Sequence, residues 1–383
     1  MRKLVIAIII GWVMLLLFRY EGLFFIENLF ADTLTTQTRE VDPRIKIIAI
    51  DEESLEKIGS WPWSRGDLAD LADTLASSGA TAVWPNLLFT EKSADPNQDK
   101  ELAQVIAKYD NIYLPVYFDF EVLTKTKEEI EQEYLKLPVV DIPMERIGHI
   151  NVLGDKDNVV RKLLPGVPTL DEEIVPSIDI ILANLLLPES KRITWNEDYF
   201  WFKGEEPILL DEKLQIGLSY SSPPQDPQFD IIPAWKVIEG ETDAKHFENS
   251  IVMIGLYATD QADHYLSPFS KEQMNSVEIH ANSIQAIIED KLYNKLTPSY
   301  GAFLVLLVGM LSFTIFELLS KRVGAIVLIL SIVGYTVFVP YYYSVSQVLL
   351  PYSYTIFALL FAFGSSIIER YLAKRKGLKG NVI

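Results

Sequence analysis

Three long apolar runs near the C-terminus constrain this 383-residue chain more than any other feature. They cover Gly301–Phe316, Val323–Val339 and Val348–Ile368, and each is long enough to cross a bilayer as a helix. Lipid offers no hydrogen-bond partners, so a spanning segment must satisfy its backbone internally, which a helix does. The sequence therefore predicts three transmembrane helices in its C-terminal part.

A fourth apolar run, Leu4–Phe18, follows Arg2 and Lys3 at the N-terminus. It is short for a span, but Arg19 can snorkel and Tyr20 can anchor the helix at the interface. A cleavable signal peptide is the alternative, although no convincing small-residue cleavage site follows the run. We expect an uncleaved anchor, which makes four transmembrane helices, one N-terminal and three C-terminal.

The charges are distributed unevenly between these runs and the region that they enclose. The runs and their flanks hold nine Lys and Arg and two Glu, which leaves 25 basic and 50 acidic residues between positions 19 and 300. A region this acidic argues against nucleic acid or anionic lipid as its partner. The chain has no cysteine, which excludes disulfides and thiolate metal sites. We expect no nucleic acid, metal or cofactor.

The basic clusters agree on one orientation in the membrane. Lys and Arg favour cytoplasmic loops, and four spans place Arg2–Lys3, Lys321–Arg322 and the tail from Arg370 to Lys376 together in the cytoplasm. Both termini are then cytoplasmic, and the acidic region is extracytoplasmic. We expect four parts: an anchor (1–26), an extracytoplasmic domain (27–298), a three-helix transmembrane region (299–370) and a cytoplasmic basic tail (371–383).

The enclosed region is expected to form an α/β domain with a largely parallel sheet. Ile45–Ile50 is typical of a strand that is buried on both faces. The helical spacing of Asp67–Ser78 and a second strand at Ala80–Val83 follow within about 40 residues, which predicts a βαβ unit and parallel pairing. A polar helical stalk at Glu27–Glu40 is expected before the first strand, and a helix is expected at Val277–Leu292.

Polar residues follow the first strand at the edge where open α/β sheets bind ligands. Asp51 and Glu52 come directly after it, and at least one of them could instead cap a short helix that we expect to start at Ser54. Arg65 could pair with Asp51 across this edge, or it could hold an anionic ligand.

The segment Trp61–Pro62–Trp63 before Arg65 is conformationally stiff. Trp61 and Trp63 could pack into the core or form a platform for a ligand. His149 lies in a β-branched run and is more often a core histidine than a metal ligand.

Asp263, His264, Glu278 and His280 combine carboxylates with imidazoles, which can bind a divalent ion or move protons. Glu278 and His280 point in different directions, however, if both lie on the helix that we expect there. They share a face only if the segment is extended.

Asp155, Asp157 and Asn158 suggest a Ca²⁺ site at first sight. The glycine and the distant glutamate of an EF-hand are missing. A β-turn with solvated carboxylates is the better interpretation.

Several short motifs occur in a fixed order along the chain. The first are Val41–Ile45, Ala49–Leu55 and Gly59–Arg65, and the later ones are Gly148–Val152, Asp155–Arg161, Pro176–Ile178, Val252–Gly255, Asp263–Phe269 and Val277–Asn282. Together they resemble the second type of CHASE domain, an extracytoplasmic sensory domain of bacterial receptors. The sequence departs from the family pattern at Asn86, where aspartate is more usual, and at Asn158 and Ser276, where glycine is usual.

The resemblance implies a transmembrane receptor in the bacterial cytoplasmic membrane that detects an unknown small-molecule or protein cue. It also implies a homodimer and a cytoplasmic nucleotide cyclase or kinase as output. The sequence stops about 13 residues after its last span, so we expect the output domain either in a longer chain or in a separate partner. The expected ligand-binding candidates are Asp51, Glu52, Trp61, Trp63, Arg65, Asn86, His149, Asp263, Glu278 and His280.

Under this interpretation the chain itself is not an enzyme and has no catalytic residues. Two alternatives come from other classes of protein. One is a membrane-anchored extracytoplasmic hydrolase that uses Asp51, Asp263 and His280, and the other is a scaffold in an envelope complex.

Overall fold

The computed structural model describes residues 2–120 and 134–380, apart from residues 170, 172, 197, 199, 225, 259 and 261. The chain divides into two compact units. The helical unit comprises Met1–Thr35 and Tyr293–Ile383, and the lobe comprises Thr36–Leu292. The end of the expected basic tail, including the side chains of Lys376 and Lys379, lies outside the described residues.

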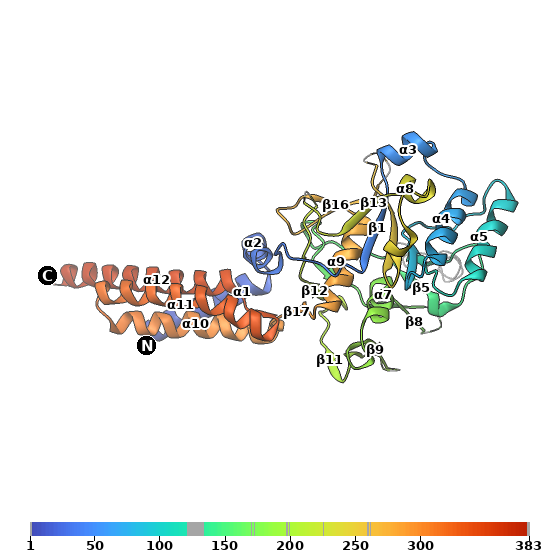
Figure 1. The fold of residues 1–383 in the computed structure, drawn as a ribbon. Coiled ribbons are helices and arrows are strands. Elements are labelled where there is room, and N and C mark those ends of the chain that lie inside the picture. Colours follow the sequence, from blue (N-terminus) through green and yellow to red (C-terminus); the bar gives the residue numbers. More distant parts are fainter. Residues whose placement is uncertain are drawn as a thin grey trace. The chain divides into compact units, whose positions relative to one another are not determined.

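The helices are labelled in Figure 1. They are α1 (Arg2–Arg19), α2 (Phe24–Thr35), α3 (Glu52–Ile58), α4 (Arg65–Ser77), α5 (Pro96–Lys108), α7 (Ile178–Leu186), α8 (Ala234–Ile238), α9 (Ser276–Ile288), α10 (Pro298–Leu318), α11 (Lys321–Ser346) and α12 (Tyr352–Gly380). Short 3₁₀ turns occur at Met144–Arg146, Glu189–Lys191 and Ala244–Phe247.

The strands are short, and most of them belong to the lobe. They are β1 (Ile45–Ile50), β2 (Ala82–Pro85), β3 (Leu114–Phe118), β4 (Leu135–Lys136), β5 (Ile147–His149), β6 (Lys162–Leu163), β7 (Gly166–Pro168), β8 (Ile174–Pro176), β9 (Ile193–Trp195), β10 (Trp201–Lys203), β11 (Glu206–Ile208), β12 (Ile216–Leu218), β13 (Asp230–Pro233), β14 (Ile251–Leu256), β15 (His264–Leu266), β16 (Gln273–Asn275), β17 (Leu292–Lys295) and β18 (Val348–Leu349).

Four parallel strands in the order β13-β1-β14-β2 form the central sheet of the lobe. A parallel bridge from Val83 to Ile112 and the parallel pair β3–β5 continue this arrangement beyond β2. The mixed α/β class with a parallel sheet is thus confirmed. β1 and β2 are parallel as predicted, but β14, from much later in the chain, lies between them.

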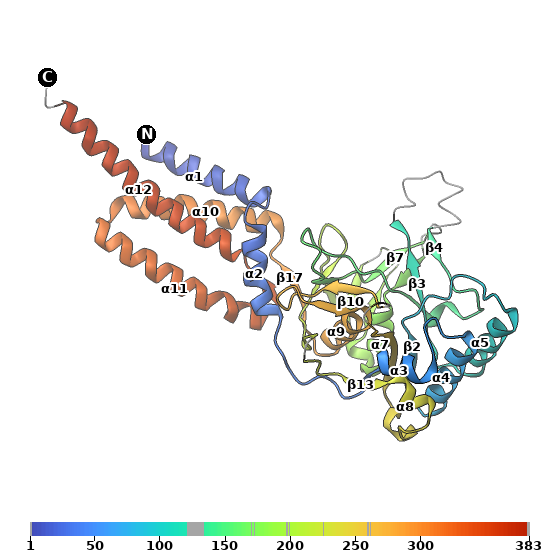
Figure 2. The same cartoon turned by 90° about the horizontal axis from the view of Figure 1, so that it is seen from above.

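All six residues of β1 are buried, and their side chains alternate between two cores. Ile45 and Ile47 join the core that contains residues of α7 and α9, whereas Ile48 and Ile50 join the core of α4, α5 and α8. Helices therefore cover both faces of the sheet (Figures 1 and 2). Burial of each isoleucine stabilises the fold by about 1.5–3 kcal/mol, which is why β1 can be apolar on both sides.

Several expected element boundaries were wrong. The helix expected at Val277–Leu292 ends at Ile288, and Leu292 is the first residue of β17. The short helix after β1 begins at Glu52 rather than at Ser54, because Asp51 is its N-cap and accepts a hydrogen bond from the Ser54 N–H at 2.9 Å. The stalk helix runs over Phe24–Thr35 rather than Glu27–Glu40, and the Thr-rich sequence after it is not helical.

In the helical unit, α1, α10, α11 and α12 lie side by side (Figure 1). Three helices, α10, α11 and α12, are long and apolar enough to cross a membrane, and the bent pair α1–α2 could supply a fourth span, with 69° between its two helices. The third run begins as a helix only at Tyr352. Pro351 precedes it, and Val348–Leu349 instead pairs in parallel with β17.

Candidate functional site

The topology of the sheet singles out the carboxyl end of β14. The helices that follow β1 and β2 pack on one face of the sheet, while α9, which follows β14, packs on the other. A point where adjacent parallel strands send their connections to opposite faces is where open α/β sheets bind ligands. β14 has such a point on each side.

Five polar residues define this carboxyl-edge site. Asp51 follows β1, Asn86 follows β2, Tyr257 follows β14, and Asn275 and Glu278 belong to the start of α9. The Tyr257 N–H donates to the carbonyl of Ile50 at 2.9 Å, which ties the ends of β14 and β1 together.

Close contacts fix the first turn of α9 at this edge. The Asn86 Nδ2 donates to the Ser276 hydroxyl at 3.0 Å. Gly255 allows the approach of the helix, because a Cβ there would lie 2.6 Å from the Cβ of Val277. The first turn of α9 is therefore positioned by β2 and β14 together.

Glu278 is the buried carboxyl group of the site. It is only 3% exposed, and its Oε2 accepts a hydrogen bond from the Asn275 N–H at 3.1 Å. Burial raises the pKa of Glu278 to about 7, although the hydrogen bonds from Asn275 oppose this. Burial and the charge of Glu278 also raise the pKa of Tyr257 well above its ordinary value.

The side chain of His280 points away from that of Glu278, because residues two positions apart on a helix lie on different faces. Its Nδ1 lies 2.8 Å from Oδ1 of Asp179 on α7, and both side chains are buried. His280 also makes an edge-on ring contact with Trp84, at 5.1 Å between ring centroids. His280 therefore joins α9 to α7 in the interior.

His149 is a buried core residue on β5. Its Nδ1 accepts a hydrogen bond from the Asn151 N–H at 3.3 Å. Burial, reinforced by the charge of His280, lowers the pKa of His149 to about 3. The imidazole is therefore neutral at ordinary pH.

Arg65 does not pair with Asp51, which corrects one expectation. The Arg65 guanidinium contacts the Asp99 carboxylate and the carbonyl of Glu91, because Arg65 is the first residue of α4 and faces α5. Trp61 and Trp63 pack on the core formed by α4, α5 and α8, and the Trp63 indole N–H donates to the carbonyl of Gly59 at 2.8 Å. Glu52 is exposed in the first turn of α3.

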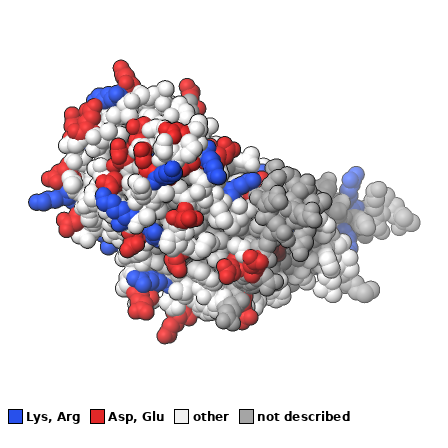
Figure 3. Space-filling view, turned by 90° about the vertical axis from the view of Figure 1, so that its right-hand side faces the viewer, with Lys and Arg blue, Asp and Glu red and all other residues white. Residues whose placement is uncertain are grey.

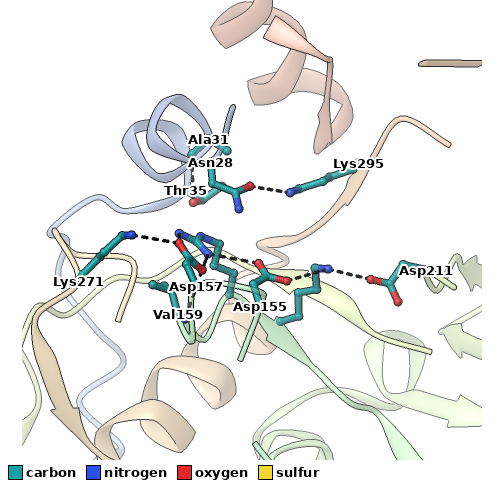
Figure 4. A network of polar contacts seen from close by, with 11 residues as sticks. Asn28, Ala31, Thr35, Asp155, Asp157, Val159, Asp211, Lys271 and Lys295 are labelled. Carbon is teal, nitrogen blue, oxygen red and sulfur yellow. Dashed lines mark hydrogen bonds and ion pairs between the residues drawn. The ribbon is translucent and has the colours of Figure 1, made fainter. Parts of the chain in front are cut away.

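The aspartates of the 155–158 turn are not solvated, which corrects a second expectation. Arg161, itself 2% exposed, contacts Oδ2 of Asp155 at 3.3 Å and Oδ1 of Asp157 at 2.8 Å. Lys162 joins Asp155 to Asp211, and Lys271 contacts Asp157 (Figure 4). The side chains therefore form an alternating chain of ion pairs that links three loops of the lobe.

The residues proposed for hydrolysis do not form one constellation. Asp263 is exposed and its backbone carbonyl accepts from the Ser276 N–H at 2.9 Å, whereas His280 is engaged with Asp179 in the interior. Within the part of the chain that the structure describes, no group of three or more His, Asp or Glu side chains is arranged to hold a metal ion.

Sequence reasoning missed Tyr257, Asn275 and Asp179. Tyr257 precedes the β15–β16 hairpin and Asn275 is its last residue, and only the position of β14 in the sheet reveals them as neighbours. Asp179 follows Pro176–Ser177, and its position in the first turn of a helix was a usable signal for a functional or structural carboxylate.

One face of the lobe carries many Asp and Glu side chains with Lys and Arg between them (Figure 3). Three helices of the chain are long and apolar enough to cross a membrane. The chain belongs to the CHASE2 family, because the family model described as "CHASE2 domain" matches residues 7–315. No curated protein and no solved structure showed significant similarity to it. CHASE2 domains are extracellular sensory modules rather than catalytic ones, as the motif resemblance had indicated.

Proposed function

We propose that this protein is a bacterial transmembrane receptor whose lobe detects an extracytoplasmic cue at the carboxyl-edge site and relays it through the membrane helices. The output is a cytoplasmic nucleotide cyclase or kinase, in the same longer chain or as a separate partner. The receptor acts as a homodimer, since such outputs in the family work as dimers.

The observation that carries this proposal is the position of α9. Its first turn forms part of the carboxyl-edge site, and every residue from Val277 to Ile287 is buried in the lobe. After α9 the chain continues through β17 into α10, the first of the three apolar C-terminal helices. A displacement at the start of α9 therefore has a short covalent path to a membrane helix.

The ion pairs within the helical unit support the orientation with both termini in the cytoplasm. Arg2 contacts Glu369 at 2.7 Å and Lys3 contacts Glu317 at 2.9 Å. These pairs gather the start of α1 with the ends of α10 and α12. The basic residues at the start of α1 therefore lie at the same end of the bundle as the ends of α10 and α12. This is the arrangement that the positive-inside rule favours.

Because the chain has no cysteine, single cysteines report topology directly. In intact cells, we expect an impermeant maleimide to label Lys213→Cys in the lobe and to leave Lys321→Cys, in the link between α10 and α11, unlabelled until the cells are lysed. Labelling of both positions in intact cells would refute the receptor proposal. Lys213→Cys in lysed cells controls for reactivity of the thiol.

A scaffold in an envelope complex is the other outcome to be tested. Crosslinking in native membranes that yields a stoichiometric non-self protein, together with output unaffected by any variant of the carboxyl-edge site, would favour it over the receptor.

A further inference from the structure

We propose that the cue read at the carboxyl-edge site is the proton, and that Glu278 is the group that binds it. This inference rests on the proposed sensory function and names its ligand. Protonation neutralises a carboxyl group in the first turn of α9, and loss of the proton places a charge there. The protein then reports extracytoplasmic pH.

The surroundings of Glu278 favour proton binding over an ion pair. The side chain is buried, and its described hydrogen-bond donor is the Asn275 N–H, a neutral group. No Lys, Arg or His interacts with it within the described part of the lobe. Burial of an unpaired carboxylate is costly, and a protein reduces that cost by taking up a proton.

The elements packed against α9 are α7, β1, β12, β14, β15 and β16. Their titratable groups are Lys46 on β1, Asp51 after β1, Tyr257 after β14, Asp263, His264 and Tyr265 at β15, Asp179 on α7 and His280 on α9 itself. Lys46 is paired with Asp230 at 2.8 Å. The charge of Glu278 adds to the effect of burial in raising the pKa of Tyr257. Both groups become anionic on losing a proton, so Tyr257 cannot stabilise ionised Glu278 by its charge.

The matching group on α4 shows that burial makes the difference. Asp67, like Glu278, is the third residue of a 13-residue helix and accepts from the N-cap N–H, here that of Ser64 at 3.2 Å. Asp67 is exposed to solvent, whereas Glu278 is buried. The capping carboxyl group is therefore exposed to water in α4 and buried in α9.

The pKa of about 7 that burial gives Glu278 supports the assignment, because it lies within the pH range in which a sensor is useful. The sign follows from linkage. A carboxyl whose pKa is raised from 4.5 in the folded state stabilises the fold fully below the unfolded value and loses that contribution as pH rises through about 7. Deprotonation is therefore expected to loosen the first turn of α9.

The test uses the full chain in lipid nanodiscs, with protons alone as the ligand. Infrared difference spectra should show a carboxyl band that titrates with a midpoint near pH 7 in the wild type and that is absent in Glu278→Gln. Hydrogen exchange of Ser276–His280 should be several-fold faster in the wild type than in Glu278→Gln at about pH 8, and equal at about pH 5. Asp67→Asn, the matched capping carboxyl, should retain both wild-type responses.

A titration midpoint at an ordinary carboxyl pKa, or a neutral-pH band that persists in Glu278→Gln, would overturn the proton assignment. That result leaves the receptor proposal standing, because the topology measurement tests it separately. Conversely, inverted topology with an intact titration would retain the proton site and refute the receptor. Tyr257→Phe should leave the Glu278 midpoint and the exchange response close to those of the wild type, because Tyr257 is neutral near pH 7. Loss of both responses in Tyr257→Phe would contradict the assignment of the proton to Glu278.

Discussion

Asp179 and His280 lie 2.8 Å apart in the interior of the lobe and connect α7 with α9. Each side chain is about 2% exposed. The contact therefore holds α9 against α7 within the lobe, and the chain continues from α9 through β17 into α10.

Removal of either partner should destabilise the lobe strongly. Asp179→Ala and His280→Ala each leave a polar group buried without its partner, which costs on the order of 3–5 kcal/mol. The corresponding fall in the thermal unfolding midpoint is on the order of 10 °C, measurable by circular dichroism of the full chain in detergent. The double variant should be less destabilised than the sum of the single variants, and strict additivity would contradict a direct interaction.

The ion-pair chain around Arg161 should make the lobe sensitive to acid. Arg161 and Lys271 hold the pKa of Asp157 at about 2, against the effect of burial. A lowered pKa means that the stabilisation is present above the unfolded value of 3.8 and is lost as pH falls towards about 2. Asp157→Asn should reduce the stability of the lobe at neutral pH, and its stability should fall less steeply than that of the wild type as pH drops from 3.8 to about 2.

Unfolding midpoints measured at a series of pH values test this expectation. The matched control is Asp73→Asn, which breaks the exposed pair with Lys108 at 2.7 Å. Surface pairs contribute little, so the control should follow the wild-type curve. If the unfolding midpoint falls equally with decreasing pH in Asp157→Asn and the wild type, the buried ion pairs do not govern the stability of the lobe in acid.

Gly148 marks the closest approach of β5 to the first residue of α7. A Cβ at this position would lie 2.5 Å from the Cα of Ile178, a backbone atom that cannot move by side-chain rotation. Gly148→Ala should therefore cost about 1–3 kcal/mol or more. The control is Gly66→Ala in α4, where the nearest atom is the flexible end of Glu101 at 3.0 Å; it should be neutral or slightly stabilising.

Glu27 on α2 caps the N-terminus of α12 within the helical unit. Its Oε1 accepts from the Tyr352 N–H at 2.9 Å and its Oε2 from the Ser353 N–H at 2.7 Å. Loss of such a cap costs about 1 kcal/mol, so Glu27→Ala should raise hydrogen exchange at the start of α12 about five-fold. Thr33→Ala, whose hydroxyl bonds the Phe30 carbonyl of its own helix, should leave that exchange unchanged.

The predicted elements show what local patterns can reveal. The buried strand Ile45–Ile50, the apolar C-terminal helices and the cap at Asp51 were all predictable, because periodicity, hydropathy and capping chemistry act between neighbours in the chain. Register and partner choice were not. Arg65 has an aspartate near it in sequence at position 67 and another after β1, yet it pairs with Asp99.

The sequence by itself determined the long apolar helices, the α/β class and the family, since each follows from short-range composition or ordered motifs. Only the tertiary structure decided which polar residues meet. Placing β14 between β1 and β2 brings Tyr257 and Glu278 to the edge that Asp51 and Asn86 occupy, across about 200 residues of chain. Glu278 and Asp67 have the same capping position but differ in burial. The free energy of a charged group depends on its surroundings and not on its position in a motif.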